Sequence, residues 1–275
     1  MPQPLPLQPN RNINIMKKAG WILLALACCL GACAPNNVKI EHDWEKYFTK
    51  NKAEGCFMLF DNSQGQFQAY NMDRIRLRFP PSGTFDILNT LIALQTGKIP
   101  HTSTVIPDSV TGQNLSTDQA FKVGDDAHFR EMARLIGRQN MAAWMDSVKY
   151  GNMKIDSIDR FWLDNTLLIS ADEQLGFAKK LYFDNLPFTK TSMEEVRKMM
   201  LQENTSKYTL SYKISAGKMG KKNVGWVVGW IEENRHPTFF VLNIESEDPA
   251  FDMKKIQLQT TRDILLAAGY FKGEK

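Results

Sequence analysis

The sequence predicts an α+β protein in which one antiparallel sheet takes strands from both ends of the chain. Two strand-like segments come first, at 55–60 and 66–70, around an Asn-Ser-Gln-Gly turn. Helical periodicity fills the middle, and segments rich in Val, Phe, Trp and Tyr follow at 208–215, 223–231 and 238–245. Strands interrupted by a run of helices are typical of an α+β domain. We therefore expect a helical block between the two parts of the sheet.

The first residues have the pattern of an export signal. Residues 1–15 are rich in Pro, Gln and Asn without periodicity, which predicts an untranslated or disordered leader and a start at Met16. Residues 16–32 carry two lysines and then an apolar run, which is shorter than the roughly 20 residues that a membrane-spanning helix needs. The Leu-Gly-Ala before Cys33 resembles a bacterial lipobox. This resemblance implies a signal peptide over 16–32 and lipidation of Cys33.

A lipid anchor at Cys33 predicts a location in the bacterial cell envelope, outside the cytoplasmic membrane. By analogy with enteric sorting, Ala34 favours the outer membrane, facing the periplasm. Cleavage removes three basic residues and no acid, so the net charge falls from +4 to +1. A nearly neutral protein gives no electrostatic reason to expect nucleic acid as a partner, or membrane contact beyond the anchor. Cys56 then remains as the single unmodified cysteine, which excludes an intramolecular disulfide.

The mature chain has the length of one domain. Residues 33–50 would hold the lipidated cysteine, a short tether and a first helix, and residues 51–275 would form the domain itself. Two prolines prevent helix just before Ser82, so Ser82 or Gly83 is expected to cap a buried central helix. Helical spacing returns at 125–135, 140–148, 171–183 and 192–201, and a long helix closes the chain at 252–268.

Five strings in this order carry a resemblance that covers about 55–270. They are Arg-Phe-x-Pro-x-x-Thr-Phe-x-Ile from Arg78, Ala-Phe-Lys-Val from Ala120 with the helical string from Phe129, Tyr-Gly-Asn from Tyr150, Phe-Trp-Leu from Phe161, and Gly-Lys-Met-Gly from Gly217 followed by Gly-Trp-Val-Val-Gly-Trp. Together they resemble the class D β-lactamases and the related penicillin-sensing domains. The resemblance implies the β-lactamase/transpeptidase-like fold.

The same resemblance shows where the chain departs from the family. The nucleophilic serine falls on Gly83, and the lysine that is carbamylated and acts as general base falls on Asp86. The serine of the second motif falls on Gly124. In the third motif Lys218 is kept, Met219 replaces the hydroxyl residue, and Gly220 follows; Tyr150 and Trp162 stand where the family has its own. The resemblance therefore implies ligand contacts at Lys218, Met219, Gly220, Asp126, Tyr150 and Trp162.

These departures remove the parts of an acyl-transfer reaction. Such a reaction needs a nucleophile that a nearby base activates. Gly83 has no oxygen, and a carboxylate with a pKa of about 4, such as Asp86, is a weak base. Loss of a nucleophile or its base typically lowers kcat by about 10⁴ to 10⁶. The sequence therefore names no confident catalytic residue and leaves open whether the protein is an enzyme.

Several residues keep two interpretations. Ser82 is either a helix cap or a displaced nucleophile. Asp125 and Asp126 are either acids in the first turn of a helix or, with Asp86, ligands of a hard cation. We expect no metal and no cofactor. The four histidines show no ligand spacing and are expected on the surface, whereas Trp226 and Trp230 share one face of a strand and are expected in the core.

The sequence therefore predicts an exported lipoprotein of class D β-lactamase type that binds or senses a peptidoglycan fragment or a β-lactam without hydrolysing it. One alternative is a hydrolase that uses Ser82. Another is a scaffold that contacts protein partners in the envelope.

Overall fold

The computed structural model describes residues 1, 3, 37–107, 112 and 114–275. One folded unit spans Val38–Lys275, and the residues before it form a separate unit. The predicted signal peptide and Cys33 lie outside the described residues, as does the predicted leader apart from positions 1 and 3. In the described part of the chain, no helix has the length and apolar character needed to cross a bilayer.

The folded unit is built on a seven-stranded sheet with the order β1-β3-β2-β9-β8-β7-β6. β1 is parallel to β3, and every other neighbouring pair is antiparallel. β2 and β3, from the start of the domain, join the sheet through β9, as the sequence predicts. The strands are β1 (Val38–Ile40), β2 (Glu54–Asp61), β3 (Gln66–Tyr70), β6 (Leu201–Asn204), β7 (Thr209–Met219), β8 (Lys222–Glu233) and β9 (His236–Ser246), and a small second sheet pairs β4 (Arg78–Phe79) with β5 (Ile169–Ser170).

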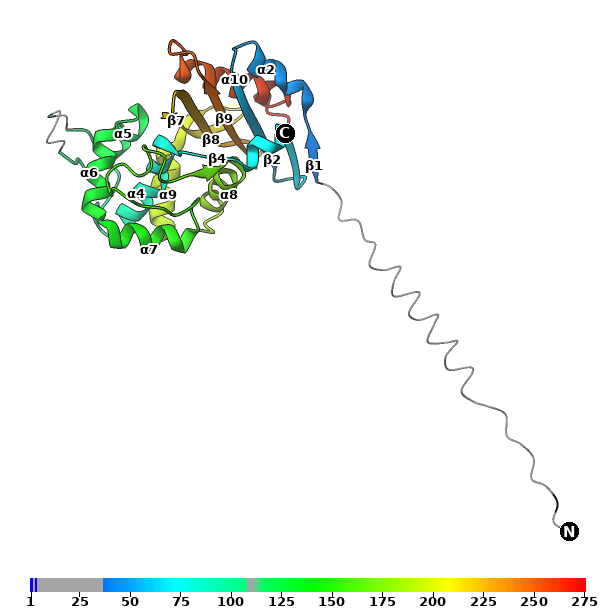
Figure 1. Cartoon of the computed structure of the whole chain (residues 1–275), viewed down its shortest axis with the longest axis horizontal. Helices are drawn as coiled ribbons and strands as arrows, with labels where there is room; N and C mark the ends of the chain where they lie inside the picture. Colours follow the sequence, from blue (N-terminus) through cyan, green and yellow to red (C-terminus); the bar gives the residue numbers. More distant parts are fainter. Residues whose placement is uncertain (2, 4–36, 108–111, 113) are drawn as a thin grey trace. The chain divides into compact units, whose positions relative to one another are not determined.

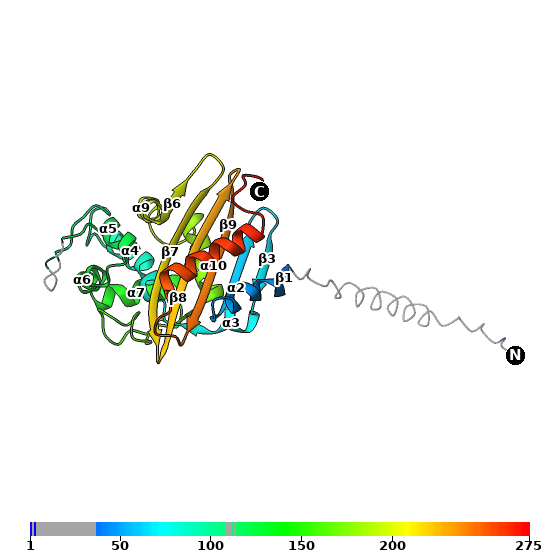
Figure 2. The ribbon, with the colours of Figure 1, turned by 90° about the horizontal axis from the view of Figure 1, so that it is seen from above.

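Helices cover both faces of this sheet (Figures 1 and 2). The helical block on one face surrounds α4, which contacts α6, α7 and α9 and is buried from Asp86 to Ala93. The block contains α4 (Asp86–Gln95), α5 (Thr117–Val123), α6 (Asp126–Ile136), α7 (Arg138–Val148), α8 (Ala171–Tyr182) and α9 (Lys190–Met200). Short helices η2 (His42–Trp44) and α2 (Glu45–Thr49) and the closing helix α10 (Met253–Ala267) lie on the other face, and α3 (Met72–Arg76) follows β3.

Strand alternation gives the protein two cores. Successive side chains of a strand point to opposite faces of the sheet. Trp226 and Trp230 accordingly pack with the helical block, which confirms their predicted place in the core. Val227 and Ile231, one residue further along in each case, pack with α10 on the opposite face. Because both faces are covered, β8 and β9 are buried along almost their whole length.

Two expectations are wrong. The central helix begins with a 3₁₀ turn, η3 (Ser82–Phe85), which continues directly into α4. Ser82 is not its cap, because the Ser82 hydroxyl has no hydrogen-bond partner among the described residues and its backbone N–H donates to the carbonyl of Trp162. His128 is also not on the surface: it is buried at the start of α6, where Nε2 lies 3.1 Å from Thr117 Oγ1. His42, His101 and His236 are exposed, as expected.

Close strand packing makes Gly229 a sensitive position. A Cβ atom at Gly229 would lie 2.0 Å from the Ser211 carbonyl oxygen and 2.7 Å from Tyr212 Cα, so the backbones of β7 and β8 would have to separate. We expect Gly229→Ala to lower the free energy of unfolding by more than 2 kcal/mol, measured by urea denaturation, as is typical when a core is overpacked (about 1–3 kcal/mol).

Gly176 is the matched control for Gly229. It lies inside α8, and apart from its chain neighbours and the backbone of its own helix, no atom of the described residues lies within 4 Å of the position that its Cβ would take. Gly176→Ala is expected to raise the free energy of unfolding by about 0.5–1 kcal/mol, because alanine loses less conformational entropy in a helix. Equal effects of the two alanines would contradict the account of the β7–β8 contact.

Candidate functional site

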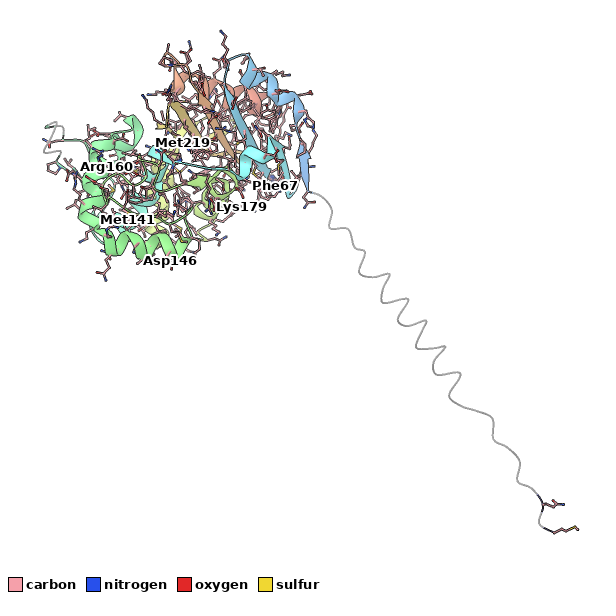
Figure 3. The ribbon with its side chains drawn as sticks, in the orientation of Figure 1. Phe67, Met141, Asp146, Arg160, Lys179 and Met219 are labelled. Atoms are coloured by element: carbon pink, nitrogen blue, oxygen red, sulfur yellow. The ribbon has the colours of Figure 1, made fainter. Side chains whose placement is uncertain are left out.

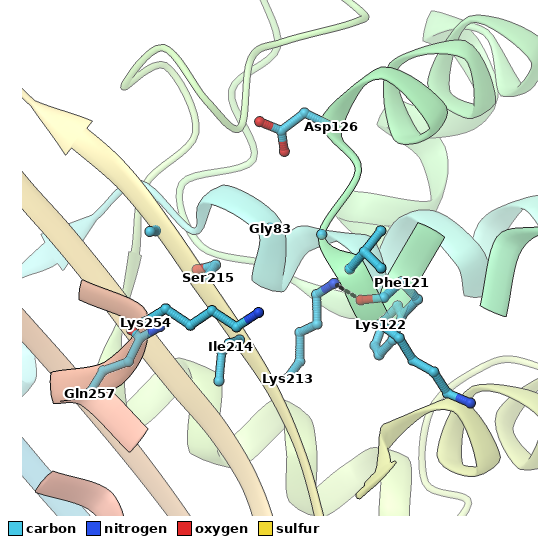
Figure 4. A pocket seen from close by; sticks show the side chains of 12 residues that line it. Gly83, Phe121, Lys122, Asp126, Lys213, Ile214, Ser215, Lys254 and Gln257 are labelled. Atoms are coloured by element: carbon cyan, nitrogen blue, oxygen red, sulfur yellow. Dashed lines mark hydrogen bonds between the residues drawn. The ribbon is translucent and has the colours of Figure 1, made fainter. Parts of the chain in front are cut away.

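A cavity of about 190 Å³ opens where the sheet meets the helical block (Figure 4). Gly83 of η3 forms one wall, and residues 121–124 at the end of α5 form another. Residues 213–216 of β7 run along the cavity, and Lys254 and Gln257 reach it from α10. Elements that are far apart in the sequence therefore meet at the position where the resemblance places the nucleophile of the family.

A buried ion pair lies beside this cavity. Lys213 Nζ, from β7, is 2.9 Å from Asp86 Oδ2, in the first turn of α4, and both side chains are at most 3% exposed. The same ammonium donates a hydrogen bond of 2.6 Å to the carbonyl oxygen of Phe121 and lies 4.0 Å from the centre of the Phe121 ring. This single cation thus connects β7, α4 and α5.

Burial changes the acid–base properties of Asp86. Removal from water raises the pKa of its carboxyl group to about 7, and the ammonium group of Lys213 only partly offsets this effect. The nearby carboxylates of Asp126 and Asp125 raise the pKa slightly further. Asp86 Oδ1 has no hydrogen-bond partner among the described residues. The desolvation of this carboxylate therefore outweighs the attraction of its partner.

Gly83 offers no side chain to the cavity. A Cβ atom at this position would lie 3.3 Å from Ser215 Cβ and 3.4 Å from Asp86 Oδ2. Ser215 donates its hydroxyl to the carbonyl oxygen of Pro81 at 3.0 Å, which holds β7 against η3. A small side chain at position 83 would therefore need shifts of only a few tenths of an ångström.

Ser82 is held in a strained conformation next to the cavity. Its φ of +48° lies in the left-handed region, which a residue with a Cβ atom adopts rarely. The side chain is 1% exposed and does not line the cavity. A Cβ atom at Gly217 would lie 2.1 Å from Ser82 Oγ, so this hydroxyl is packed against the backbone of β7. Such strain is common at functional sites.

The structure places the third-motif residues away from the cavity. Lys218 and Met219 end β7 and Gly220 lies in the turn that follows, all three exposed, and Figure 3 shows Met219 at this end of the sheet. None of the three lines the cavity. The lysine beside Gly83 and Asp86 is Lys213, five residues earlier on the same strand. Ligand binding by Lys218, Met219 or Gly220 thus remains a prediction that this geometry does not favour.

The second-motif segment does reach the cavity. Gly124 ends α5 with a φ of +77°, and both Gly124 and Asp126 line the cavity. Asp125 caps α6 by accepting backbone N–H groups of Ala127 and His128. Asp86 and Asp125 thus have separate partners, and within the described ranges no three His, Cys, Asp or Glu side chains are arranged to hold a metal ion.

Tyr150 and Trp162 both pack against Phe85, the last residue of η3. Trp162 is fully buried and stacks on Phe85, with ring centres 5.3 Å apart. Tyr150 packs edge-on against the same ring at 5.7 Å. Neither residue lines the cavity, so a packing role accounts for both of them.

Comparison with known proteins decides the family. The family model described as "Penicillin binding protein transpeptidase domain" matches residues 55–266, which is most of the chain. The chain belongs to the penicillin-binding protein transpeptidase domain family. It is 30% identical to β-lactamase OXA-48 of Klebsiella pneumoniae over 81% of this chain and 86% of that protein. It is 28% identical to the regulatory protein BlaR1 of Bacillus licheniformis over 78% of this chain and 37% of BlaR1.

Two solved structures share the fold of this chain over most of its length. The class D β-lactamase YbXI from Nostoc superposes with a TM-score of 0.78 at 30% identity, covering 82% of this chain and 98% of that one. The C-terminal domain of the Bacillus licheniformis BlaR penicillin-receptor gives a TM-score of 0.79 at 26% identity, covering 85% and 97%. The fold that the resemblance implied, of class D β-lactamase type, is therefore confirmed.

Strand alternation could have predicted that Lys213 faces the helical block. Ser215 pairs with Trp226 and Ser211 pairs with Trp230, and directly opposed residues of an antiparallel pair point to the same face. Lys213 lies between the two serines on that face, so the predicted core position of the tryptophans places Lys213 against the helical block. Lys254 and Gln257 had no comparable signal, because only tertiary packing brings α10 to the cavity.

The ion pair can be tested through the stability of its variants. We expect Lys213→Met to lower the free energy of unfolding at pH 8 by about 3–5 kcal/mol, because the carboxylate of Asp86 is left buried without a cation. The double variant Asp86→Asn/Lys213→Met is expected to be at least as stable as the native protein, since it contains no buried charge at this position. Urea denaturation measures both, and a double variant less stable than Lys213→Met would contradict this account.

Stability is also expected to depend on pH through Asp86. Its pKa is about 7 in the folded protein and about 4 in an unfolded chain, so between these values the folded state binds the proton more tightly. The free energy of unfolding should therefore fall from pH 4 to pH 7 relative to that of Asp86→Asn/Lys213→Met, which lacks this proton. Urea titrations at pH 5 and pH 8 compare the two proteins. A constant difference would show that the pKa of Asp86 is not raised.

Proposed function

We propose that this protein binds a β-lactam-like or peptidoglycan-like ligand in the cavity beside Gly83 without hydrolysing it. The observation that carries the proposal is the Asp86–Lys213 ion pair. The carboxylate at the position of the family's base is already bound to a cation, and Gly83 supplies no nucleophile for it to activate. The two components that acyl transfer requires are thus both missing from one site.

Retention of the cavity supports a binding role. The cavity is open, and its lining combines main-chain groups of β7 with charged side chains from α5, α6 and α10. Few polar groups in a concave site are sufficient to orient a ligand. A penicillin receptor is among the proteins of similar structure, which supports ligand recognition as the retained property.

A second candidate function is hydrolysis with Ser82 as nucleophile. It is supported by the strained backbone of Ser82 and by its buried hydroxyl, which has no partner in the described structure. The position of this hydroxyl against Gly217 favours the binding role, since the oxygen does not face the cavity. A scaffold that contacts envelope proteins is the third alternative.

The export signal extends the proposal to the cell envelope. The residues from Met16 to Cys33 support a lipid anchor at Cys33, and Ala34 supports the outer membrane. A ligand derived from peptidoglycan would be available at this location. Radiolabelled palmitate incorporation that depends on Cys33 would test the anchor.

Intact-mass spectrometry with a penicillin separates these functions. The protein is incubated with benzylpenicillin, and its mass and its heat of binding are measured. We expect reversible binding and no covalent adduct. An adduct on Ser82 would establish the hydrolase alternative, and the absence of any binding would favour the scaffold.

Two variants provide the matched comparison in the same experiment. Gly83→Ser alone is expected to form no adduct, because its serine would lack an activating base. Gly83→Ser/Asp86→Lys restores both residues that the resemblance assigns to the reaction, and it is expected to form an acyl adduct. A folded double variant without an adduct would show that positions 83 and 86 do not by themselves account for the missing activity.

A further inference from the structure

The cavity beside Gly83 presents charges of both signs from separate elements. Lys254 lies in the first turn of α10 and Asp126 in the first turn of α6, and both are exposed. Figure 4 shows the Lys254 side chain extending toward the middle of the cavity, with Asp126 on the opposite side. Among the described residues, no ion pair includes either side chain. Both charges are therefore available to a ligand.

The other two lysines that line the cavity, Lys213 and Lys122, do not offer a free ammonium group to a ligand at its centre. The ammonium group of Lys213 is compensated by Asp86 at 2.9 Å and by the carbonyl oxygen of Phe121. Lys122 also lines the cavity, but its ammonium group points away from the middle in Figure 4. One cation and one anion, on opposite sides, thus remain to face a bound molecule.

Uncharged groups between them favour an amide-containing ligand. Gln257 is buried, lines the cavity, and has an amide oxygen without a partner in the described part of the chain. This oxygen is packed against β8, since a Cβ atom at Gly225 would lie 2.5 Å from it, so the amide of Gln257 contributes to the wall and not to ligand contacts. β6 pairs with β7 at residues 209–211, and within the described part of the chain no strand pairs with the same edge of β7 at 212–219. Main-chain groups of β7 are therefore within reach of a peptide-like molecule.

From these observations we infer that the cavity selects zwitterionic ligands, with Asp126 receiving an ammonium group and Lys254 receiving a carboxylate. This inference rests on the proposed function, because it requires that a ligand occupies this cavity. It goes further by specifying the charge pattern of that ligand. A molecule with a carboxylate alone satisfies Lys254 and leaves Asp126 without a partner.

Two pairs of ligands that differ by one charge test the inference. Ampicillin carries an ammonium group that benzylpenicillin lacks, and N-acetylation removes the ammonium group of D-alanyl-D-alanine. We expect the zwitterion of each pair to bind the native protein about 3- to 10-fold more tightly, as for one partly exposed ion pair. Isothermal titration calorimetry at low ionic strength measures the four affinities.

Variants then assign the preference to residues. Asp126→Asn should remove the preference for the zwitterions and leave the affinities for the two anions unchanged. Lys254→Gln should weaken all four ligands by a similar factor. Lys255→Gln and Asp146→Asn change exposed residues that do not line the cavity, so they should leave all four affinities as in the native protein.

The outcomes separate this inference from the proposed function. Equal affinities within both pairs would overturn the zwitterion inference while the binding function stands. If neither penicillin binds but D-alanyl-D-alanine binds more tightly than its acetylated form, and Asp126→Asn removes the difference, the inference stands and the β-lactam part of the function fails. A preference that survives Asp126→Asn would overturn the assignment to Asp126.

Discussion

The ammonium group of Lys213 is almost fully buried between the sheet and the helical block. Asp86 supplies the counter-charge from α4, and the carbonyl oxygen of Phe121 supplies a further acceptor from α5. Removal of either charged partner leaves an uncompensated charge in the interior, which is among the largest single destabilising changes in proteins. Each charge at the junction of β7 with the helical block therefore requires the other.

The same contact involves the residue that the resemblance places at the position of the family's base. The carboxylate of Asp86 stands where the resemblance places a base, and one of its oxygens, Oδ2, is paired with Lys213. Burial already disfavours its charged form, so the pair is maintained against a desolvation penalty. An apolar pair would avoid that penalty. The two charges are therefore not expected to add stability relative to an apolar pair of similar size.

A strained backbone conformation occurs at Ser82, next to the cavity. Ser82 adopts a left-handed backbone conformation inside a short 3₁₀ turn, and its hydroxyl packs against Gly217. The surrounding contacts hold this conformation: its N–H donates to the carbonyl of Trp162, and Ser215 anchors Pro81. Strain of this kind persists only where the surrounding contacts determine the backbone conformation, as they do here.

From the sequence alone came the fold class, a sheet that takes strands from both chain ends, and the core face of the strand that carries Trp226 and Trp230, because periodicity and alternation are local properties. The sequence also identified Gly83, Asp86, Gly124 and Asp126 as residues near one site. The family motif pointed to Lys218 instead of Lys213, although alternation along the strand places Lys213 on the face of the core tryptophans. Tertiary structure alone decided the burial of His128, the conformation of Ser82 and the approach of Lys254, because each depends on elements that are distant in the sequence and are brought together by packing.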